Sequence, residues 1–172
     1  EEGSLDYFIP KTVEGTSGYT VPGKRKAEVV TAKGCVARCT FCHRFERGFR
    51  AISVDRLVEH LRHLVSNYNV GCVSIADENF GSDRKIAWEL AIRLGEMGLR
   101  WRVSGVRTRS VTQESLQHWK DNGCVEVHYG IESGSPKMLK VMEKNLTLEE
   151  NIEALKWTGE ADLTTCIQLV LG

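Results

Sequence analysis

The chain has 172 residues, of which 41% are hydrophobic and 27% charged, a composition typical of one packed domain. Lys and Arg total 23, as do Asp and Glu, so the formal net charge is zero and a dedicated nucleic-acid binder is disfavoured. No apolar run approaches the roughly 20 residues of a membrane helix, and no signal peptide opens the chain, which disfavours a membrane protein.

Cysteine usage indicates a reducing compartment. Six cysteines are present, three of them within one short segment and three scattered along the chain. A secreted domain of this size more often spreads its cysteines as a disulfide framework. We therefore expect a cytoplasmic protein in which the clustered cysteines have a metal or redox role.

The pattern of glycine, proline and apolar residues divides the chain at about residue 27. Residues 1–27 contain Pro10, Gly15, Gly18, Pro22 and Gly23, which predicts a loose lead-in or linker. Residues 28–172 alternate between the two kinds of regular structure. The predicted strands are 28–33, 70–76, 99–106, 124–131 and 162–171. Predicted helices cover 54–67 and 86–97, and three more follow the cap residues Thr112, Ser135 and Thr147.

Strands and helices that alternate at this spacing predict parallel strands joined by right-handed crossovers. An open barrel and a doubly wound sheet both fit this alternation. Each predicted strand ends in a polar or glycine-rich junction. A parallel barrel builds its active site from several such ends, whereas a doubly wound sheet concentrates its site at one switch point. We therefore predict an α/β fold, a parallel βα barrel of about five strand–helix units.

The strongest chemical signal follows the first predicted strand, in the segment Cys35-Val36-Ala37-Arg38-Cys39-Thr40-Phe41-Cys42. Iron–sulfur clusters are held by cysteine runs of this kind. A [4Fe–4S] cluster held by three cysteines keeps one iron open to a small molecule, which favours a catalytic cluster over an electron carrier. One alternative is a structural zinc site with His43 or a distant cysteine as fourth ligand, although such sites usually have a second cysteine pair downstream. Chance clustering of buried cysteines is another.

Basic residues surround this segment and are expected to lower the pKa of its thiols and to stabilise an electron-rich cluster. They are Lys33, Arg38, Arg44, Arg47 and Arg50, opposed by Glu46.

The C-x3-C-x2-C loop, with Phe41 before its last cysteine, resembles that of radical S-adenosylmethionine (SAM) enzymes. Three later segments resemble the same superfamily: Asp77-Glu78-Asn79-Phe80, Gly130-Ile131-Glu132-Ser133-Gly134, and Leu139–Lys144 followed by the Thr147 cap. Together, over residues 28–172, they are most similar to the branch that often carries a cobalamin-binding domain. Val36 stands where many relatives have proline. Cores of this superfamily are usually open barrels of six strand–helix units, so the resemblance implies a partial, open βα barrel that stops before the sixth unit, and the chain is expected to be incomplete.

The resemblance implies two cofactors and their ligands. Cys35, Cys39 and Cys42 would ligate a [4Fe–4S] cluster, whose open iron would bind the amino and carboxylate groups of SAM. The other implied contacts to SAM are Phe41 at the adenine, Asp77, Glu78 and Asn79 at the ammonium, Ser104 and Glu132 at the ribose or amino-acid part, and Arg107 at the carboxylate. One electron from the reduced cluster would cleave SAM, and the 5′-deoxyadenosyl radical would abstract hydrogen from a substrate.

The implied function is a radical SAM enzyme core for radical methylation, rearrangement or carbon–carbon bond formation on a small-molecule or peptide substrate. An electron donor such as flavodoxin or ferredoxin would be a partner, and a domain outside this chain would bind cobalamin. A methylthiotransferase-like core and a non-catalytic iron–sulfur or zinc module are the alternatives. Elsewhere, Cys72, Cys124 and Cys166 are predicted to be buried small hydrophobes, and His128 a core or barrel-lining residue.

Overall fold

The computed structural model describes residues 20–43 and 48–171. Five parallel strands form its main sheet: β1 (Arg25–Val29), β4 (Val70–Ala76), β5 (Arg100–Val106), β6 (Cys124–Glu132) and β7 (Thr164–Leu169). Their order in the sheet is their order along the chain, and each pairs in parallel with the next. Because this order never reverses, the sheet lacks the switch point of a doubly wound fold. The predicted open βα barrel is confirmed.

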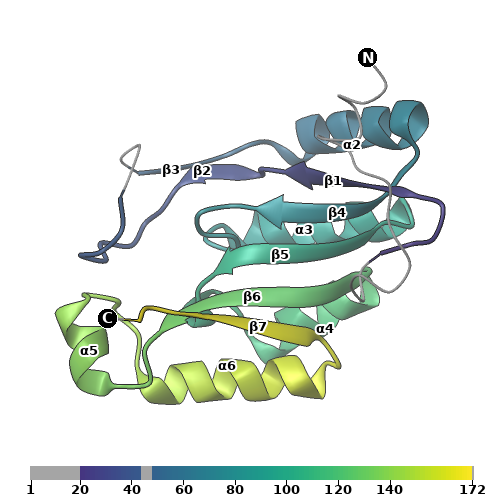
Figure 1. Cartoon of the computed structure of the whole chain (residues 1–172). Helices are drawn as coiled ribbons and strands as arrows, with labels where there is room; N and C mark the ends of the chain where they lie inside the picture. Colours follow the sequence, from purple (N-terminus) through teal and green to yellow (C-terminus); the bar gives the residue numbers. More distant parts are fainter. Residues whose placement is uncertain (1–19, 44–47, 172) are drawn as a thin grey trace.

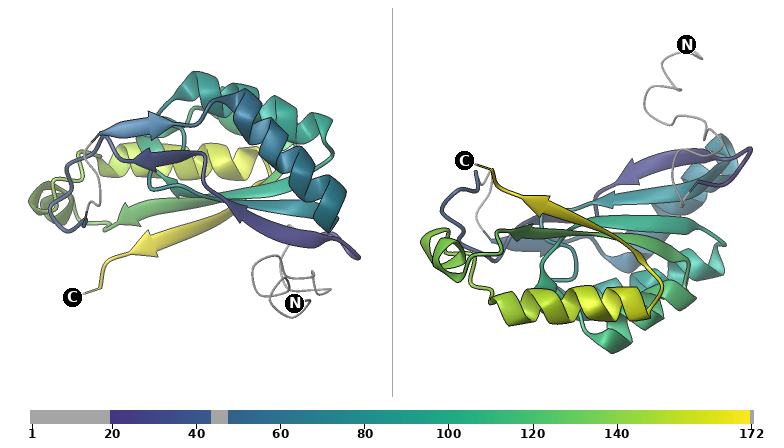
Figure 2. Two further views of the ribbon diagram at one scale, coloured as in Figure 1. Left: turned by 90° about the horizontal axis from the view of Figure 1, so that it is seen from above. Right: turned by 60° about the horizontal axis from the view of Figure 1, so that its bottom comes forward.

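The helices that connect these strands cover one face of the sheet (Figures 1 and 2). They are α2 (Val54–Tyr68), α3 (Arg84–Glu96), α4 (Gln113–Asp121) and α6 (Leu148–Glu160), with the short η1 (Thr108–Ser110) and α5 (Pro136–Val141) near the carboxyl ends of β5 and β6. The three predicted caps are confirmed. The side chains of Thr112, Ser135 and Thr147 each accept a hydrogen bond from a backbone N–H in the first turn of their helix.

The two faces of the sheet differ in polarity, as alternation along each strand requires. Toward the helices, Val73, Val103 and Val127 are fully buried in the hydrophobic core. On the other face, Nε of Arg102 donates to Oγ of Ser74 over 3.1 Å. The Arg102 guanidinium also lies 3.8 Å from the carboxylate of Glu126, which in turn contacts the ring of His128. The interior of the open barrel is therefore polar, and His128 lines it.

The first predicted strand is wrong in detail. In place of one strand over 28–33, the structure has β1 and then β2 (Ala32–Gly34), and β2 pairs antiparallel with β3 (Phe49–Ala51), a strand that was not predicted. β1 also begins at Arg25, within the predicted lead-in. The segments that carry Pro10, Gly15, Gly18, Arg44, Glu46 and Arg47 lie outside the described residues.

The strand β7 is an edge of the main sheet, and all six of its residues are exposed. The prediction that Cys166 is buried is therefore wrong, because it lies on this exposed edge strand. Cys72 and Cys124 are buried, as predicted. None of the described helices has the length and apolarity needed to cross a bilayer.

Candidate active site

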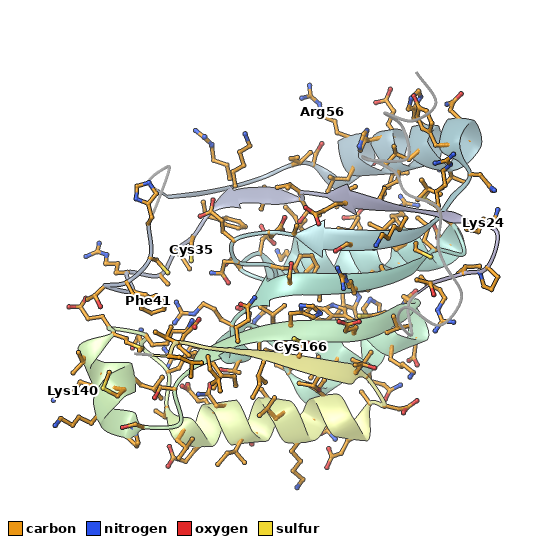
Figure 3. All side chains as sticks on the ribbon, in the orientation of Figure 1. Lys24, Cys35, Phe41, Arg56, Lys140 and Cys166 are labelled. Carbon is orange, nitrogen blue, oxygen red and sulfur yellow. The ribbon has the colours of Figure 1, made fainter. Side chains whose placement is uncertain are left out.

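The cysteine loop, residues 35–43, leaves β2 at the carboxyl end of the sheet, on the same side of the molecule as α5 (Figure 3 labels Cys35, Phe41 and Lys140). Gly34 precedes it with a φ of +82°, and a Cβ there would lie 2.2 Å from the carbonyl oxygen of Gly48. Only glycine tolerates that turn. The loop docks on the end of α5 through a 2.9 Å hydrogen bond from the backbone N–H of Thr40 to the carbonyl of Met142.

The three cysteines of this loop line one cavity of about 260 Å³, here called the cysteine cavity. Cys39 is buried, Cys35 half-buried and Cys42 exposed. Other side chains that line it belong to His43, Glu78, Arg107, Glu132, Lys144 and Gln168. The structure thus brings the three predicted metal ligands together with three of the predicted SAM ligands.

The arrangement of the thiols fits an iron–sulfur cluster. Cys35, Cys39 and Cys42 line one cavity. A [4Fe–4S] cluster takes each cysteine on a different iron, so three thiols around one cavity suit it.

The pKa of Cys42 differs from the expectation of a lowered value. Burial raises the pKa of the Cys42 thiol, the nearby thiols of Cys39 and Cys35 raise it further, and Lys144 opposes them. Two of the expected basic neighbours, Lys33 and Arg50, are exposed and lie opposite each other in the β2–β3 hairpin. A bound cluster would supply the positive charge that these thiolates otherwise lack.

Lys144 is a residue of this cavity to which no role had been assigned. Its ammonium lies 2.9 Å from the carboxylate of Glu132, with both side chains nearly buried, and 5.8 Å from the ring centroid of Phe41. Gly130 makes room for the pair, because a Cβ there would lie 2.7 Å from Oε1 of Glu132. Glu132 itself has a φ of +65°, beside an irregularity in the β6–β7 pairing. The sequence did offer a signal for Lys144, because this lysine ends the segment Leu139–Lys144, which resembles the superfamily.

Glu78 and Arg107 are the other charged side chains predicted to bind SAM that face this cavity. Glu78 follows β4 and accepts a 3.3 Å hydrogen bond from the backbone N–H of Gly34, beside the cysteine loop. Arg107 follows β5 and donates to the carbonyl oxygen of Lys144. Both charges are therefore held at strand ends, as in an active site of the barrel type.

The remaining predicted SAM ligands do not line the cysteine cavity. Asp77 is buried and accepts hydrogen bonds from the backbone N–H groups of Thr31 and Ala32 over 2.6 and 3.2 Å and from the Thr31 hydroxyl. Ser104 donates to the carbonyl of Ile75 over 3.0 Å. Asn79 is 1% exposed and lines a neighbouring cleft. Asp77 therefore joins β4 to the β1–β2 junction, and Phe41 reaches the cavity through its contact with Lys144.

A parallel open barrel with three cysteines and four charged side chains around one cavity defines a class of enzyme, one that holds a metal cluster beside a small charged cosubstrate. The sequence profile of the Radical SAM superfamily matches residues 29–172. The chain belongs to this superfamily, whose cofactors are a [4Fe–4S] cluster and SAM.

Individual relatives agree with this assignment. The chain is 33% identical over 156 residues to cytidylyl-2-hydroxyethylphosphonate methyltransferase of Streptomyces wedmorensis, covering 88% of this chain and 29% of the relative. It is 31% identical over 161 residues to anaerobic magnesium-protoporphyrin IX monomethyl ester cyclase of Cereibacter sphaeroides, covering 90% and 26%. The chain spans about a third or less of the length of the curated relatives that it matches best.

Solved structures share the fold. The cobalamin-dependent SAM radical enzyme OxsB superposes with a TM-score of 0.76 at 22% identity, over 84% of this chain and 23% of that one. The radical SAM methyltransferase TsrM of Kitasatospora setae superposes with a TM-score of 0.74 at 18% identity, over 96% and 35%.

Proposed function

We propose that this chain is the catalytic core of a radical SAM methyltransferase. The observation that carries the proposal is the cysteine cavity, where three thiols and the charges of Glu78, Arg107, Glu132 and Lys144 meet at the carboxyl ends of the strands. SAM carries an ammonium, a carboxylate and a ribose, and this cavity offers a partner for each. Three of the curated relatives carry the name methyltransferase and two the name cyclase, so the names favour methylation over rearrangement or carbon–carbon bond formation by a small margin.

In this proposal each residue at the cysteine cavity has one role. Cys35, Cys39 and Cys42 hold the cluster, which when reduced supplies the electron for cleavage of SAM. Arg107 binds the SAM carboxylate, since a guanidinium suits two-point recognition of that group. Glu78 takes the ammonium, and Glu132, held in place by Lys144, accepts hydrogen bonds from the ribose hydroxyls. Phe41, 41% exposed beside the cavity, packs on the adenine.

Other partners are proposed on chemistry alone. The substrate is a small molecule or a peptide, and the reduced cluster needs an electron donor such as flavodoxin or ferredoxin. A further proposed cofactor is cobalamin, which a separate domain would bind. Free thiols and an oxygen-sensitive cluster suit the cytoplasm.

The test begins with anaerobic reconstitution by iron and sulfide. We expect about four irons per chain, a brown absorbance that dithionite bleaches, and a changed electron paramagnetic resonance spectrum of the reduced cluster when SAM is added. Replacing Cys35, Cys39 and Cys42 by Ala should abolish the absorbance. Cys166→Ala is the matched control, because Cys166 is an exposed thiol far along the chain from the loop. One zinc per chain would instead support the non-catalytic module.

The reaction is tested with SAM under reducing conditions. Formation of 5′-deoxyadenosine and methionine that is lost in Glu132→Gln, with a weakened affinity for SAM, supports the assignment of the site. An unchanged cluster spectrum with SAM would contradict it. A methylated product supports the proposal, and a methylthiolated product would support the methylthiotransferase-like alternative.

A further inference from the structure

A second and larger cleft adjoins the cysteine cavity and shares Ala37 and Arg107 with it. This cleft has a volume of about 1020 Å³ and lies among the cysteine loop, the start of α3, η1, α5 and the start of α6. It is called the basic cleft here because the basic side chains that line it are Arg38, Arg84, Arg107, Arg109 and Lys140. The acidic side chains that line it are Glu143 and Glu149.

Among the described residues, only Arg109 of these five basic side chains forms an ion pair. Arg109 binds both carboxylate oxygens of Glu150 at 2.7 and 3.0 Å, so its charge is largely satisfied. Arg84 donates to the carbonyl of Arg109 over 3.1 Å and Arg107 to that of Lys144, and a carbonyl leaves the net charge of a guanidinium in place. Among the described residues, Arg38 and Lys140 have no ion pair. Even with Glu143, Glu149 and the Glu150 that pairs with Arg109, the cleft keeps a modest excess of positive charge in a chain of zero net charge.

Two polar side chains of the cleft wall, that of the buried Asn79 and that of the half-buried Ser82, have buried polar atoms without hydrogen-bond partners among the described residues. Both belong to the loop from β4 to α3: Asn79, through its Nδ2 and Oδ1 atoms, and Ser82, through its hydroxyl. Asn79 is 1% exposed. An unsatisfied buried polar group costs stability, so such groups in a cleft wall point to a ligand that completes their hydrogen bonds.

Two helices begin at the cleft wall, where acidic side chains accompany their first turns: Asp83 at α3, and Glu149 and Glu150 at α6. α3 and α6, of 13 residues each, begin at Arg84 and Leu148, and both residues line the cleft. The first N–H groups of a helix have no partner within it and carry a partial positive charge. The carboxylate of Asp83 caps α3 by accepting hydrogen bonds from the backbone N–H groups of Lys85 and Ile86. The backbone N–H group of Arg84 does not bind this cap.

We propose that the basic cleft binds the phosphate group of a small-molecule ligand. In this proposal the phosphate contacts Asn79, Ser82 and Arg84, which lie between β4 and the start of α3. Arg38 of the cysteine loop provides a further contact. A phosphate offers more acceptor oxygens and more negative charge than a carboxylate, which matches an amide, a hydroxyl and several guanidiniums. Because Ala37 and Arg107 border both sites, a ligand held here lies next to the cysteine cavity.

Inorganic pyrophosphate is the probe, titrated calorimetrically at low ionic strength into the reconstituted chain with SAM present to fill the cysteine cavity. We expect saturable binding of one pyrophosphate per chain, weakened at least tenfold, or about 1.4 kcal/mol, by Arg84→Gln and by Ser82→Ala. Arg56→Gln is the matched control, since Arg56 is an exposed arginine on α2 (Figure 3), and it should leave the affinity unchanged. SAM binding is read separately, so this proposal and the proposed function fail on different measurements.

Asn79→Leu provides a readout that a purely structural role would not give. Removing two unsatisfied polar atoms should keep or raise the melting temperature, while the affinity for pyrophosphate falls. Lack of saturable binding, an equal loss in Arg56→Gln, or equal affinity for citrate would each overturn the proposal. The last outcome would show a general anion site with no preference for phosphate.

Discussion

At the scale of single residues, the buried pair of Glu132 and Lys144 connects the stability of the fold to the candidate site. We expect Lys144→Met to lower the free energy of unfolding by about 3 kcal/mol, because it leaves the Glu132 carboxylate buried and unpaired. Glu132→Gln should cost a similar amount, and the double variant should cost less than the sum of the two.

Urea unfolding of the apo chain measures all three variants. Lys140→Met, on an exposed lysine of α5, is the control and should change stability by less than about 0.5 kcal/mol. Additive losses in the double variant would show that the two charges do not interact.

Asp77 gives the chain a pH dependence of unusual sign. Burial raises the pKa of its carboxyl group, and the hydrogen bonds from Thr31 and Ala32 only partly oppose this. The folded state therefore holds this proton more tightly than the unfolded state, so stability falls as pH rises from the ordinary Asp pKa to the raised one.

The variant Asp77→Asn removes this proton equilibrium and keeps an acceptor for both N–H groups. We expect it to abolish the decline of melting temperature that Asp77 causes as pH rises above about 4. Melting curves at closely spaced pH values, compared between the two proteins, measure the effect. An identical decline in Asp77→Asn would assign it to other carboxyl groups.

The sequence motifs predicted part of the site and left part to the tertiary structure. Cys35, Cys39 and Cys42 lie close together in the sequence, so their spacing alone brings them to one loop. Asp77, Glu78 and Asn79 are adjacent, yet their side chains go to three different places: the β1–β2 junction, the cysteine cavity and the basic cleft. Consecutive side chains at a strand end diverge, and a motif does not tell which of them faces the site.

At the scale of elements, β7 is the exposed edge of the sheet. Ile167 and Leu169 are 47% and 52% exposed and alternate with Cys166 and Gln168, so one face of the strand is apolar and uncovered. No proline or lysine interrupts Thr164–Leu169, and an unprotected edge pairs with other chains. We expect the 172-residue chain to self-associate as its concentration rises about tenfold, as light scattering would show.

A lysine on the uncovered face should block this pairing. Ile167→Lys is expected to lower the apparent mass at high concentration toward that of the monomer, and Lys is a usual protective residue on edge strands. Ile152→Lys, on an exposed isoleucine of α6, makes the same substitution away from the edge strand and is the control. A monomer at every concentration, with a sharp unfolding transition at high temperature, would contradict the prediction.

The β2–β3 hairpin shows why some elements escaped prediction. Each of its strands has three residues, too few for an alternating pattern to stand out, and β3 follows a long loop. The longer strands β4, β5 and β6 and the capped helices have strong periodicity and were predicted within a few residues. Short strands depend on tertiary contacts, such as those of Asp77 with Thr31 and Ala32, which no local pattern records.

At the scale of the whole molecule, the cysteine loop couples the cluster site to α5. The contacts of Thr40 with the carbonyls of Met142 and Val141 join segments 101 or more residues apart in the chain. A cluster bound by three cysteines would hold the loop in one position and stabilise whatever docks on it. Loading the cluster should therefore slow hydrogen exchange in residues 35–43 and 138–146, and leave α3 and β5 unchanged.

Anaerobic hydrogen–deuterium exchange with mass spectrometry compares the apo and reconstituted chains. The triple cysteine variant, treated identically with iron and sulfide, is the control and should show no protection. Protection spread evenly over all peptides would indicate global stabilisation and would contradict a coupling specific to α5.

The unreversed order of the strands also has a consequence for synthesis on the ribosome. Each parallel strand pairs with the strand of the main sheet that emerged just before it, so no strand must wait for a distant partner or be inserted between two others. Once β1 and β4 have paired, the nascent chain can grow its sheet by one strand at a time, and each new crossover helix covers the strand just added. The chain can therefore fold progressively from its amino terminus during synthesis. A sheet with a reversed strand order must leave one edge of an inner strand exposed until a later strand is synthesised.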